Sequence, residues 1–131
     1  MPTVQTSTPP DTPTPIGPYS HIARVGPWIT IGGTAGVDPA TGELAGPDAA
    51  SQTRQILKSF RVMLESAGSD LAHILHVSVF LLDMADFDAM NRAYAEGLGV
   101  HRPARTAIGV AALPKPGARL TMSLTAVTKT P

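Results

Sequence analysis

ILHVSVFLL, residues 74–82, is the segment on which the fold depends. It is rich in β-branched and large apolar residues and is too short to favour a helix. A continuous apolar run of this kind predicts an interior strand of a sheet. The sequence on either side of it has a helical pattern, so the strand is expected to connect to its neighbours through helices.

Two amphipathic helices are predicted to flank this strand. The first begins at Asp48, a good N-cap residue, and ends at Gly68; the second is capped by Asp86 and stops at Gly99. Their apolar positions recur at spacings of three and four residues, which predicts a core-facing stripe on each helix. The stripes are Ala49, Thr53, Ile56, Phe60, Met63, Leu64 and Ala67 on the first helix, and Phe87, Met90, Tyr94 and Leu98 on the second.

Further strands complete the pattern. Residues 20–25 and 28–32 predict a hairpin that turns at Gly26 and Pro27, and residues 105–111 and 119–128 predict two later strands. The order is therefore ββαβαββ. Right-handed crossovers would place both helices on one face of a mixed sheet, giving an α+β fold with the other face uncovered.

The uncovered face is expected to be apolar. Depending on strand register, it would carry Ile29, Ile31, Val77, Val79, Ile108, Val110 and Met122. A single chain has nothing to cover such a surface, so several subunits are expected to stack their sheets, with pockets between chains.

Composition limits the function classes. The chain has 131 residues, enough for one domain, and we divide it into a flexible Pro/Thr-rich tail at 1–15 and a single domain at 16–131. Its formal net charge is zero, which removes the electrostatic argument for a nucleic-acid or anionic-membrane partner. No segment approaches the roughly 18 apolar residues of a membrane span. The chain has no cysteine, which excludes thiolate sites and permits a cytoplasmic location.

Neither a metal nor a cofactor is expected. The glycines at 32, 33 and 36 lack the Walker and Rossmann patterns and instead suggest a backbone open to close approach. The histidines at 21, 73, 76 and 101 show no metal-ligand spacing, and helix capping explains the aspartates at 83, 86 and 88.

Arg105 is the strongest candidate for chemistry. Its guanidinium is a planar fork suited to a carboxylate, and Pro103 fixes the chain that enters the strand. This arrangement predicts an anion site. The alternative is an interfacial ion pair with an acidic residue of a neighbouring subunit.

Several separated motifs resemble the RidA/YjgF family of enamine/imine deaminases. They are IGPYS (16–20), DPATGEL (38–44), QTRQIL (52–57), VFLLDMADFDAMNRAYAEGL (79–98), RPART (102–106) and VAALPK (110–115). The resemblance runs from Ile16 to Val127. It implies a chorismate-mutase-like fold, a homotrimer whose sheets form a central barrel, and clefts between the subunits.

The resemblance also implies site residues. Arg105 would hold the substrate carboxylate, Tyr19 would line the same cleft, and backbone groups of Gly33 and Ala107 would complete it. Deaminating members carry a glutamate on the last strand that positions the hydrolytic water. With one extra residue allowed in LPKPGA, that position falls at Ser123, and a second family glutamate becomes Thr121.

The function implied is hydrolysis of small 2-imino or 2-aminoacrylate-type acids to 2-keto acids and ammonia, without a cofactor. A serine cannot replace a carboxylate base at neutral pH, so we expect weak activity. The alternative is a non-catalytic small-carboxylate-binding trimer that acts as a metabolite sensor or as the partner of another enzyme. A ribonuclease is disfavoured by the zero net charge.

Overall fold

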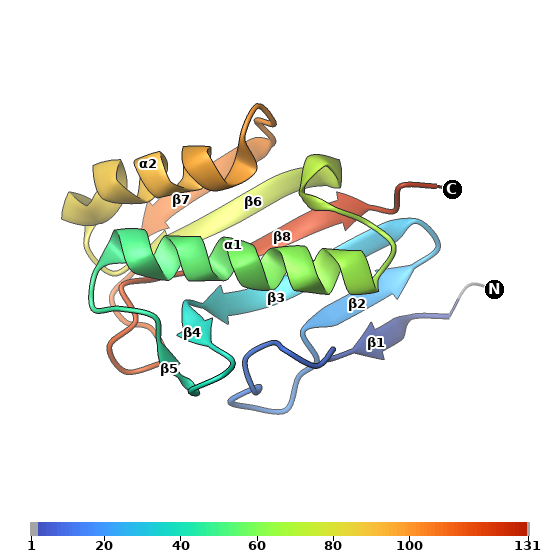
Figure 1. Cartoon of the computed structure of the whole chain (residues 1–131), viewed down its shortest axis with the longest axis horizontal. Helices are drawn as coiled ribbons and strands as arrows, with labels where there is room; N and C mark the ends of the chain where they lie inside the picture. Colours follow the sequence, from blue (N-terminus) through green and yellow to red (C-terminus); the bar gives the residue numbers. More distant parts are fainter. Residues whose placement is uncertain (1–2, 131) are drawn as a thin grey trace.

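A mixed six-stranded sheet backs two helices, in the strand order β1-β2-β3-β8-β6-β7 (Figure 1). The computed structural model describes residues 3–130. The sheet strands are β1 (Gln5–Ser7), β2 (Ile22–Val25), β3 (Trp28–Ala35), β6 (Ile74–Leu81), β7 (Ala104–Gly109) and β8 (Leu120–Val127). A separate small hairpin joins β4 (Val37–Asp38) to β5 (Glu43–Leu44).

The two helices, α1 (Ala49–Ser66) and α2 (Phe87–Leu98), lie on the same face of the sheet (Figure 1). Short 3-10 turns precede β6 and α2: η1 (Leu71–His73) and η2 (Met84–Asp86). Strand β6 runs parallel to β7 and antiparallel to β8. The predicted ββαβαββ order and mixed sheet are confirmed, with β1 and the small hairpin as additions. No helix in residues 3–130 is long and apolar enough to cross a membrane.

Local chemistry sets the helix ends. Asp48 caps α1, since its carboxylate accepts a hydrogen bond of 2.9 Å from the Ser51 N–H. Both helices stop where a glycine adopts positive φ, at Gly68 (79°) and Gly99 (64°). Asp86 occupies the N-cap position of α2 as predicted, but its side chain makes no capping bond. Its carboxylate instead accepts hydrogen bonds from Arg119, at 2.7 and 2.8 Å.

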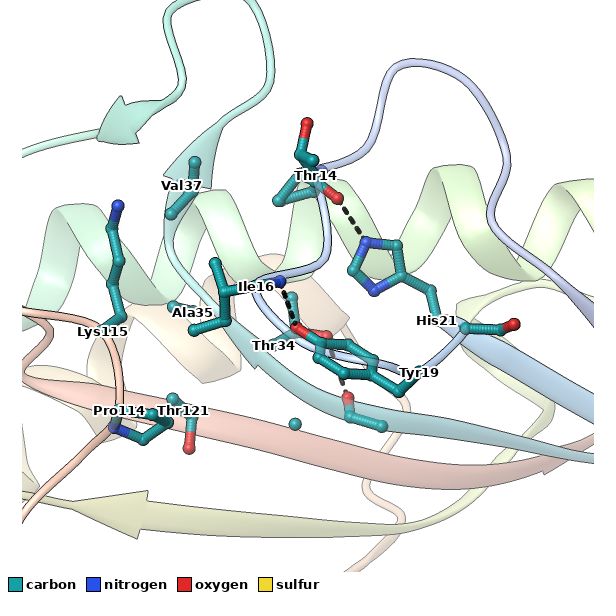
Figure 2. Close-up of a pocket in the computed structure, with 14 residues that line it drawn as sticks. Thr14, Ile16, Tyr19, His21, Thr34, Ala35, Val37, Pro114, Lys115 and Thr121 are labelled. Carbon is teal, nitrogen blue, oxygen red and sulfur yellow. Dashed lines mark hydrogen bonds between the residues drawn. The ribbon is translucent and has the colours of Figure 1, made fainter.

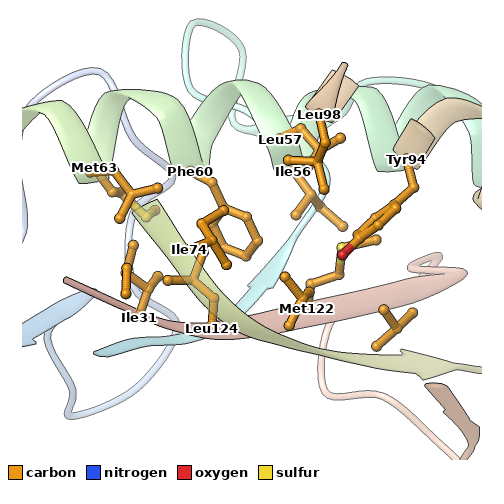
Figure 3. Close-up of a cluster of buried hydrophobic side chains, with 14 of the residues drawn as sticks. Ile31, Ile56, Leu57, Phe60, Met63, Ile74, Tyr94, Leu98, Met122 and Leu124 are labelled. Atoms are coloured by element: carbon orange, nitrogen blue, oxygen red, sulfur yellow. The ribbon is translucent and has the colours of Figure 1, made fainter. Parts of the chain in front are cut away.

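The core lies between α1, α2 and the sheet (Figure 3). Ile56, Phe60 and Met63 of α1 are fully buried against strand residues such as Ile31 and Met122. The predicted helix stripes are confirmed as core faces, because every apolar member is buried or packs against the buried cluster.

The open face of the sheet differs from the prediction. Ile29, Ile31, Val77, Val79 and Met122 are buried beneath the helices. Strand side chains alternate between faces, so the register that buries these residues sends their neighbours outward. The residues turned outward include Thr30, Ser78, Phe80, Thr106, Ile108, Thr121, Ser123 and Thr125. Of the predicted apolar set, Ile108 is on this face and Val110 lies beyond the end of β7, so the prediction that these residues make the open face apolar is wrong for most of them.

The N-terminal segment also differs from the expected flexible tail. Residues 5–7 form β1, which pairs antiparallel with β2. The Thr8 hydroxyl then accepts a hydrogen bond of 3.2 Å from the His21 N–H, and Pro13 is buried. This segment is therefore part of the folded unit.

Candidate functional site

Arg105 packs against apolar and aromatic side chains of α2 at the edge of the sheet. It lies on β7, the outermost strand, and its guanidinium is 4.9 Å from the Tyr94 ring centre and 5.7 Å from that of Phe87. One terminal nitrogen is 3.9 Å from the sulfur of Met90. Within residues 3–130, Arg105 forms no ion pair with a carboxylate. Its hydrogen-bonding fork therefore remains available to an anion.

The helical repeat of α2 brings these three side chains together. Phe87, Met90 and Tyr94 are three and four residues apart, so they share one face of α2, and β7 runs beneath that face. Ring faces attract the guanidinium and fix its plane without using its N–H groups. Burial raises the pKa of the Tyr94 hydroxyl, and the positive charge of Arg105 opposes this rise. Tyr94 is thus a neutral platform at physiological pH.

The second candidate half of the site lies beside β3, away from the β7 edge of the sheet. It is a pocket of about 520 Å³ between three segments: residues 13–21, residues 32–37, and residues 114–121 (Figure 2). Tyr19 and Gly33 both line it, as the sequence predicts for one cleft. Thr121 also lines it, whereas Ser123 does not.

The glycines of this pocket leave open space. The β3–β8 register shifts between Ile31 and Thr34, and a Cβ added at Gly32 or Gly33 would meet no atom within 4 Å. At Gly36, by contrast, a Cβ would come within 2.5 Å of the Gln52 carbonyl oxygen. Gly36 is needed for helix packing, whereas Gly32 and Gly33 expose backbone to whatever occupies the pocket.

The two halves do not meet within one chain. From β3 to β7 is three strand spacings, roughly 14 Å, and Thr121, the lining residue on β8, is two spacings from β7, roughly 10 Å. They nevertheless lie at the same level of the sheet, because paired residues run in one row from Thr34 through Met122 and Val79 to Ala107. Arg105 and Ala107 thus belong to one half-site, and Tyr19 and Gly33 to the other. Ser123 pairs with Ser78 between them.

The histidines have local structural partners. His73 contacts the Asp70 carboxylate at 2.6 Å, His101 the Ile74 carbonyl oxygen at 2.9 Å, and His76 the Thr106 hydroxyl at 3.1 Å. The bond from His73 lowers the pKa of Asp70. The described part of the chain contains no cluster of three His, Asp or Glu residues that could hold a metal ion.

Comparison with known proteins places this geometry in a family. The family model described as "Endoribonuclease L-PSP" matches residues 10–128. The chain belongs to this family, the RidA/YjgF family. It is 46% identical over 103 residues to a RutC family protein of Pyrococcus horikoshii, which covers 79% of this chain and 82% of that protein. It is 37% identical to human 2-iminobutanoate/2-iminopropanoate deaminase, over 88% of this chain and 83% of that one.

Solved structures agree with the RidA/YjgF assignment. The crystal structure of the YjgF gene product from E. coli superposes with a TM-score of 0.88 at 33% identity, covering 94% of this chain and 98% of that one. RidA from an Antarctic Psychrobacter gives a TM-score of 0.89 at 32% identity, with the same coverage. The α+β fold implied by the resemblance is therefore confirmed.

Sequence reasoning missed part of this RidA-like site. It placed Phe87, Met90 and Tyr94 in the core without linking them to Arg105. The signal was available, because a strand that follows α2 in a parallel crossover must run under the inner face of that helix. The roles of Ile16 and His21 in the pocket wall had no comparable signal, since they depend on the path of the N-terminal segment.

Proposed function

We propose that the chain forms a homotrimer in which Arg105 of one subunit faces the pocket of the next. Each chain carries one candidate half-site at its β7 edge and a different one beside β3. A head-to-tail contact joins two different surfaces of the same chain in this way. Such a contact closes into a ring when the rotation permits, and three copies would create three complete sites. A cytoplasmic location is part of this proposal.

The reaction we propose is the hydrolysis of a 2-imino acid. Water adds to the imine carbon, the carbon–nitrogen bond breaks, and ammonia leaves, so that a 2-keto acid remains; an enamine substrate first takes a proton at carbon. Arg105 would bind the carboxylate through its fork, and the pocket lined by Tyr19 and Gly33 would hold the rest of the molecule. The observation that carries the proposal is the unpaired, ring-supported guanidinium of Arg105.

We expect this activity to be weak. None of the described side chains that line the pocket is a carboxylate, and a positioned acid or base typically contributes about 10²- to 10⁴-fold. Thr121 and Ser123 both face the open side of the sheet at the positions compared with the family glutamates. Thr121 lies in the pocket, so it is the better candidate for the position of the missing base.

The same absence of a carboxylate favours a second candidate, a trimer that binds small carboxylates without hydrolysing an imine. Arg105 serves both functions equally. The ribonuclease activity in the family model's description lacks support from the composition, because zero net charge provides no positive potential for a nucleic acid.

A coupled assay separates the two candidates. A dehydratase generates 2-aminoacrylate, and keto-acid formation is followed with the native chain, Arg105→Ala, Thr121→Glu and Ser123→Glu. We expect weak native activity, loss in Arg105→Ala, and a gain of at least about tenfold in Thr121→Glu, a fraction of the usual contribution of a base. Ser123→Glu should also raise the rate, by less.

Three outcomes would change these assignments. A fast native enzyme that either glutamate slows would show that another group already activates the water. A larger gain in Ser123→Glu would return the base position to Ser123. Native activity no higher than that of Arg105→Ala, with ligands still bound, would establish the binding function instead.

A further inference from the structure

We propose that residues 13–16 form the wall that selects the substrate side chain, that His21 fastens this wall, and that the site prefers acids with large apolar side chains. The inference rests on the proposed function for the carboxylate end of the ligand. It concerns the other end, where the N-terminal segment closes one side of the pocket (Figure 2).

The segment is fastened at several points. Strand β1 pairs with β2, and the Thr12 hydroxyl donates a hydrogen bond of 2.6 Å to the Pro9 carbonyl oxygen. His21, only 3% exposed, bonds through Nε2 to the Pro13 carbonyl oxygen. A carbonyl oxygen can only accept, so Nε2 is the donor. Nδ1 has no partner among the described residues, so the contact with Pro13 is the ring's one polar attachment.

The contacts that hold the segment extend to Tyr19, the tyrosine predicted to line the substrate cleft. The Ile16 N–H donates a hydrogen bond of 3.2 Å to the Tyr19 hydroxyl, and the edge of the Tyr19 ring meets the His21 ring with centres 6.0 Å apart. Ile16, 58% exposed in the single chain, lies between Tyr19 and Val37 (Figure 2). A loosened segment would therefore displace Ile16 and release the Tyr19 ring together.

The wall is apolar. Pro13, Ile16, Ala35, Val37 and Pro114 line the pocket, and Lys115 is the one charged side chain among its described lining residues. Figure 2 shows the Lys115 side chain extending away from Tyr19. The carboxylate of a ligand is thus left to Arg105, and the contacts near Ile16 suit hydrocarbon.

The pocket is also larger than the smallest substrates require. In the single chain its volume of about 520 Å³ lies within the range of roughly 300–1,000 Å³ found for sites that take drug-sized ligands. A three-carbon imino acid would leave Ile16 without a contact. A branched side chain would bury both its own surface and that of Ile16, and each buried methylene raises affinity by about fourfold.

Calorimetric binding of two stable 2-keto acids to the full-length chain tests this. The probes are 2-oxopropanoate and 4-methyl-2-oxopentanoate, which differ by three carbons in the side chain. For the native protein we expect the larger acid to bind at least about tenfold more tightly, against an upper limit of about 60-fold for full burial. In Ile16→Ala the preference should fall to about threefold or less, with affinity for 2-oxopropanoate nearly unchanged. Val100→Ala, a fully exposed apolar residue outside the pocket, is the matched control and should behave as native.

His21 is tested as a positioning residue in the same assay. His21→Leu removes the donor to Pro13 and should abolish the size preference, with faster hydrogen exchange over residues 5–16. His21→Gln retains an N–H of similar reach and should restore both the preference and the protection. Purely structural damage would weaken the two acids equally and would not be rescued in this way.

The outcomes distinguish this inference from the proposed function. If Arg105→Ala binds both acids as the native chain does, or if no form binds either acid, the proposed function fails and this inference with it. If Arg105→Ala abolishes binding but the native chain and Ile16→Ala have the same size preference, the wall assignment alone is overturned.

Discussion

Arg105 combines a fixed position with an unused hydrogen-bonding capacity. Packing against Phe87 and Tyr94 satisfies its apolar and cation–π requirements, and among residues 3–130 its N–H groups have no carboxylate partner and only a weak contact of 3.9 Å to the Met90 sulfur. A guanidinium remains charged when partly desolvated, so half-burial does not remove its attraction for an anion. An ammonium in its place would be a point charge without the planar fork.

Replacing Arg105 by lysine separates charge from geometry. Arg105→Lys keeps the positive charge but loses the bidentate contact, so we expect 2-oxopropanoate to bind at least about tenfold more weakly. Calorimetry measures this directly. Arg102→Lys is the matched control, because Arg102 is exposed and bonds to the His101 carbonyl oxygen at 3.0 Å rather than resting on the rings. Equal affinity in Arg105→Lys and Arg102→Lys would remove Arg105 from the proposed site.

The sequence predicts some residues of the site better than others. Arg105 follows from a motif and from the chemistry of its side chain. The choice between Thr121 and Ser123 does not, because the resemblance maps a family glutamate onto each of them and both point to the same face of the strand. Thr121 lines the pocket and Ser123 does not, which favours Thr121 in the proposed site. Contacts formed by the N-terminal segment lay outside what sequence patterns could show.

At the scale of the elements, α1 depends on its N-cap. Hydrogen bonds from Ser51 lower the pKa of Asp48 below its ordinary value of 3.8. A lowered folded-state pKa means that the charged carboxylate stabilises the fold above pH 3.8, and that this contribution is lost as the pH falls through the folded value. The cap is therefore a stabilising contact at neutral pH and a weaker one in acid.

Asp48→Ala tests the cap and its pH dependence together. We expect a lower denaturant midpoint at about pH 7, and a difference from the native chain that shrinks towards about pH 3. Asp48→Asn is the control, since its amide oxygen still accepts from Ser51 but does not titrate. A difference that is the same at both pH values would show that the carboxylate's charge contributes nothing to the cap.

Elements with a strong local pattern were predictable, and their orientation was less so. The strand at Ile74–Leu81 and both helices follow from periodicity and capping residues. The face that each strand presents does not, because Ile29 and Thr30 differ by one position and a shift of one residue exchanges the two faces. Asp86 shows a similar limit: a capping pattern was present, but η2 precedes the helix and Arg119 takes the carboxylate.

At the scale of the whole molecule, the proposed assembly would bring together two candidate half-sites that one chain keeps apart. Its open sheet face is richer in hydroxyl groups than the sequence suggests, so exposure of apolar surface is a weak reason for assembly. The stronger reason for assembly is that the proposed carboxylate-binding residue and the proposed substrate pocket lie apart within one chain. Arg105 lies at the β7 edge, and the pocket extends from β3 to Thr121 on β8, two to three strand spacings away, or roughly 10–14 Å.

This arrangement predicts complementation between two inactive variants. Arg105→Ala lacks the fork, and Gly33→Leu places a side chain in the pocket, where an added Cβ meets no atom of its own chain. We expect neither homotrimer to bind 2-oxopropanoate, and light scattering to give about three times the 13.6 kDa chain mass for both.

In trimers mixed at equal ratio, an intact site needs Arg105 from a Gly33→Leu chain and the pocket of an Arg105→Ala chain. Each condition holds for half of the chains, so about one quarter of the sites should recover and be countable by calorimetry. Binding that stays absent after mixing, with subunit exchange verified by mass, would mean that each site belongs to a single chain, because only sites shared between subunits can be rebuilt from two defective partners.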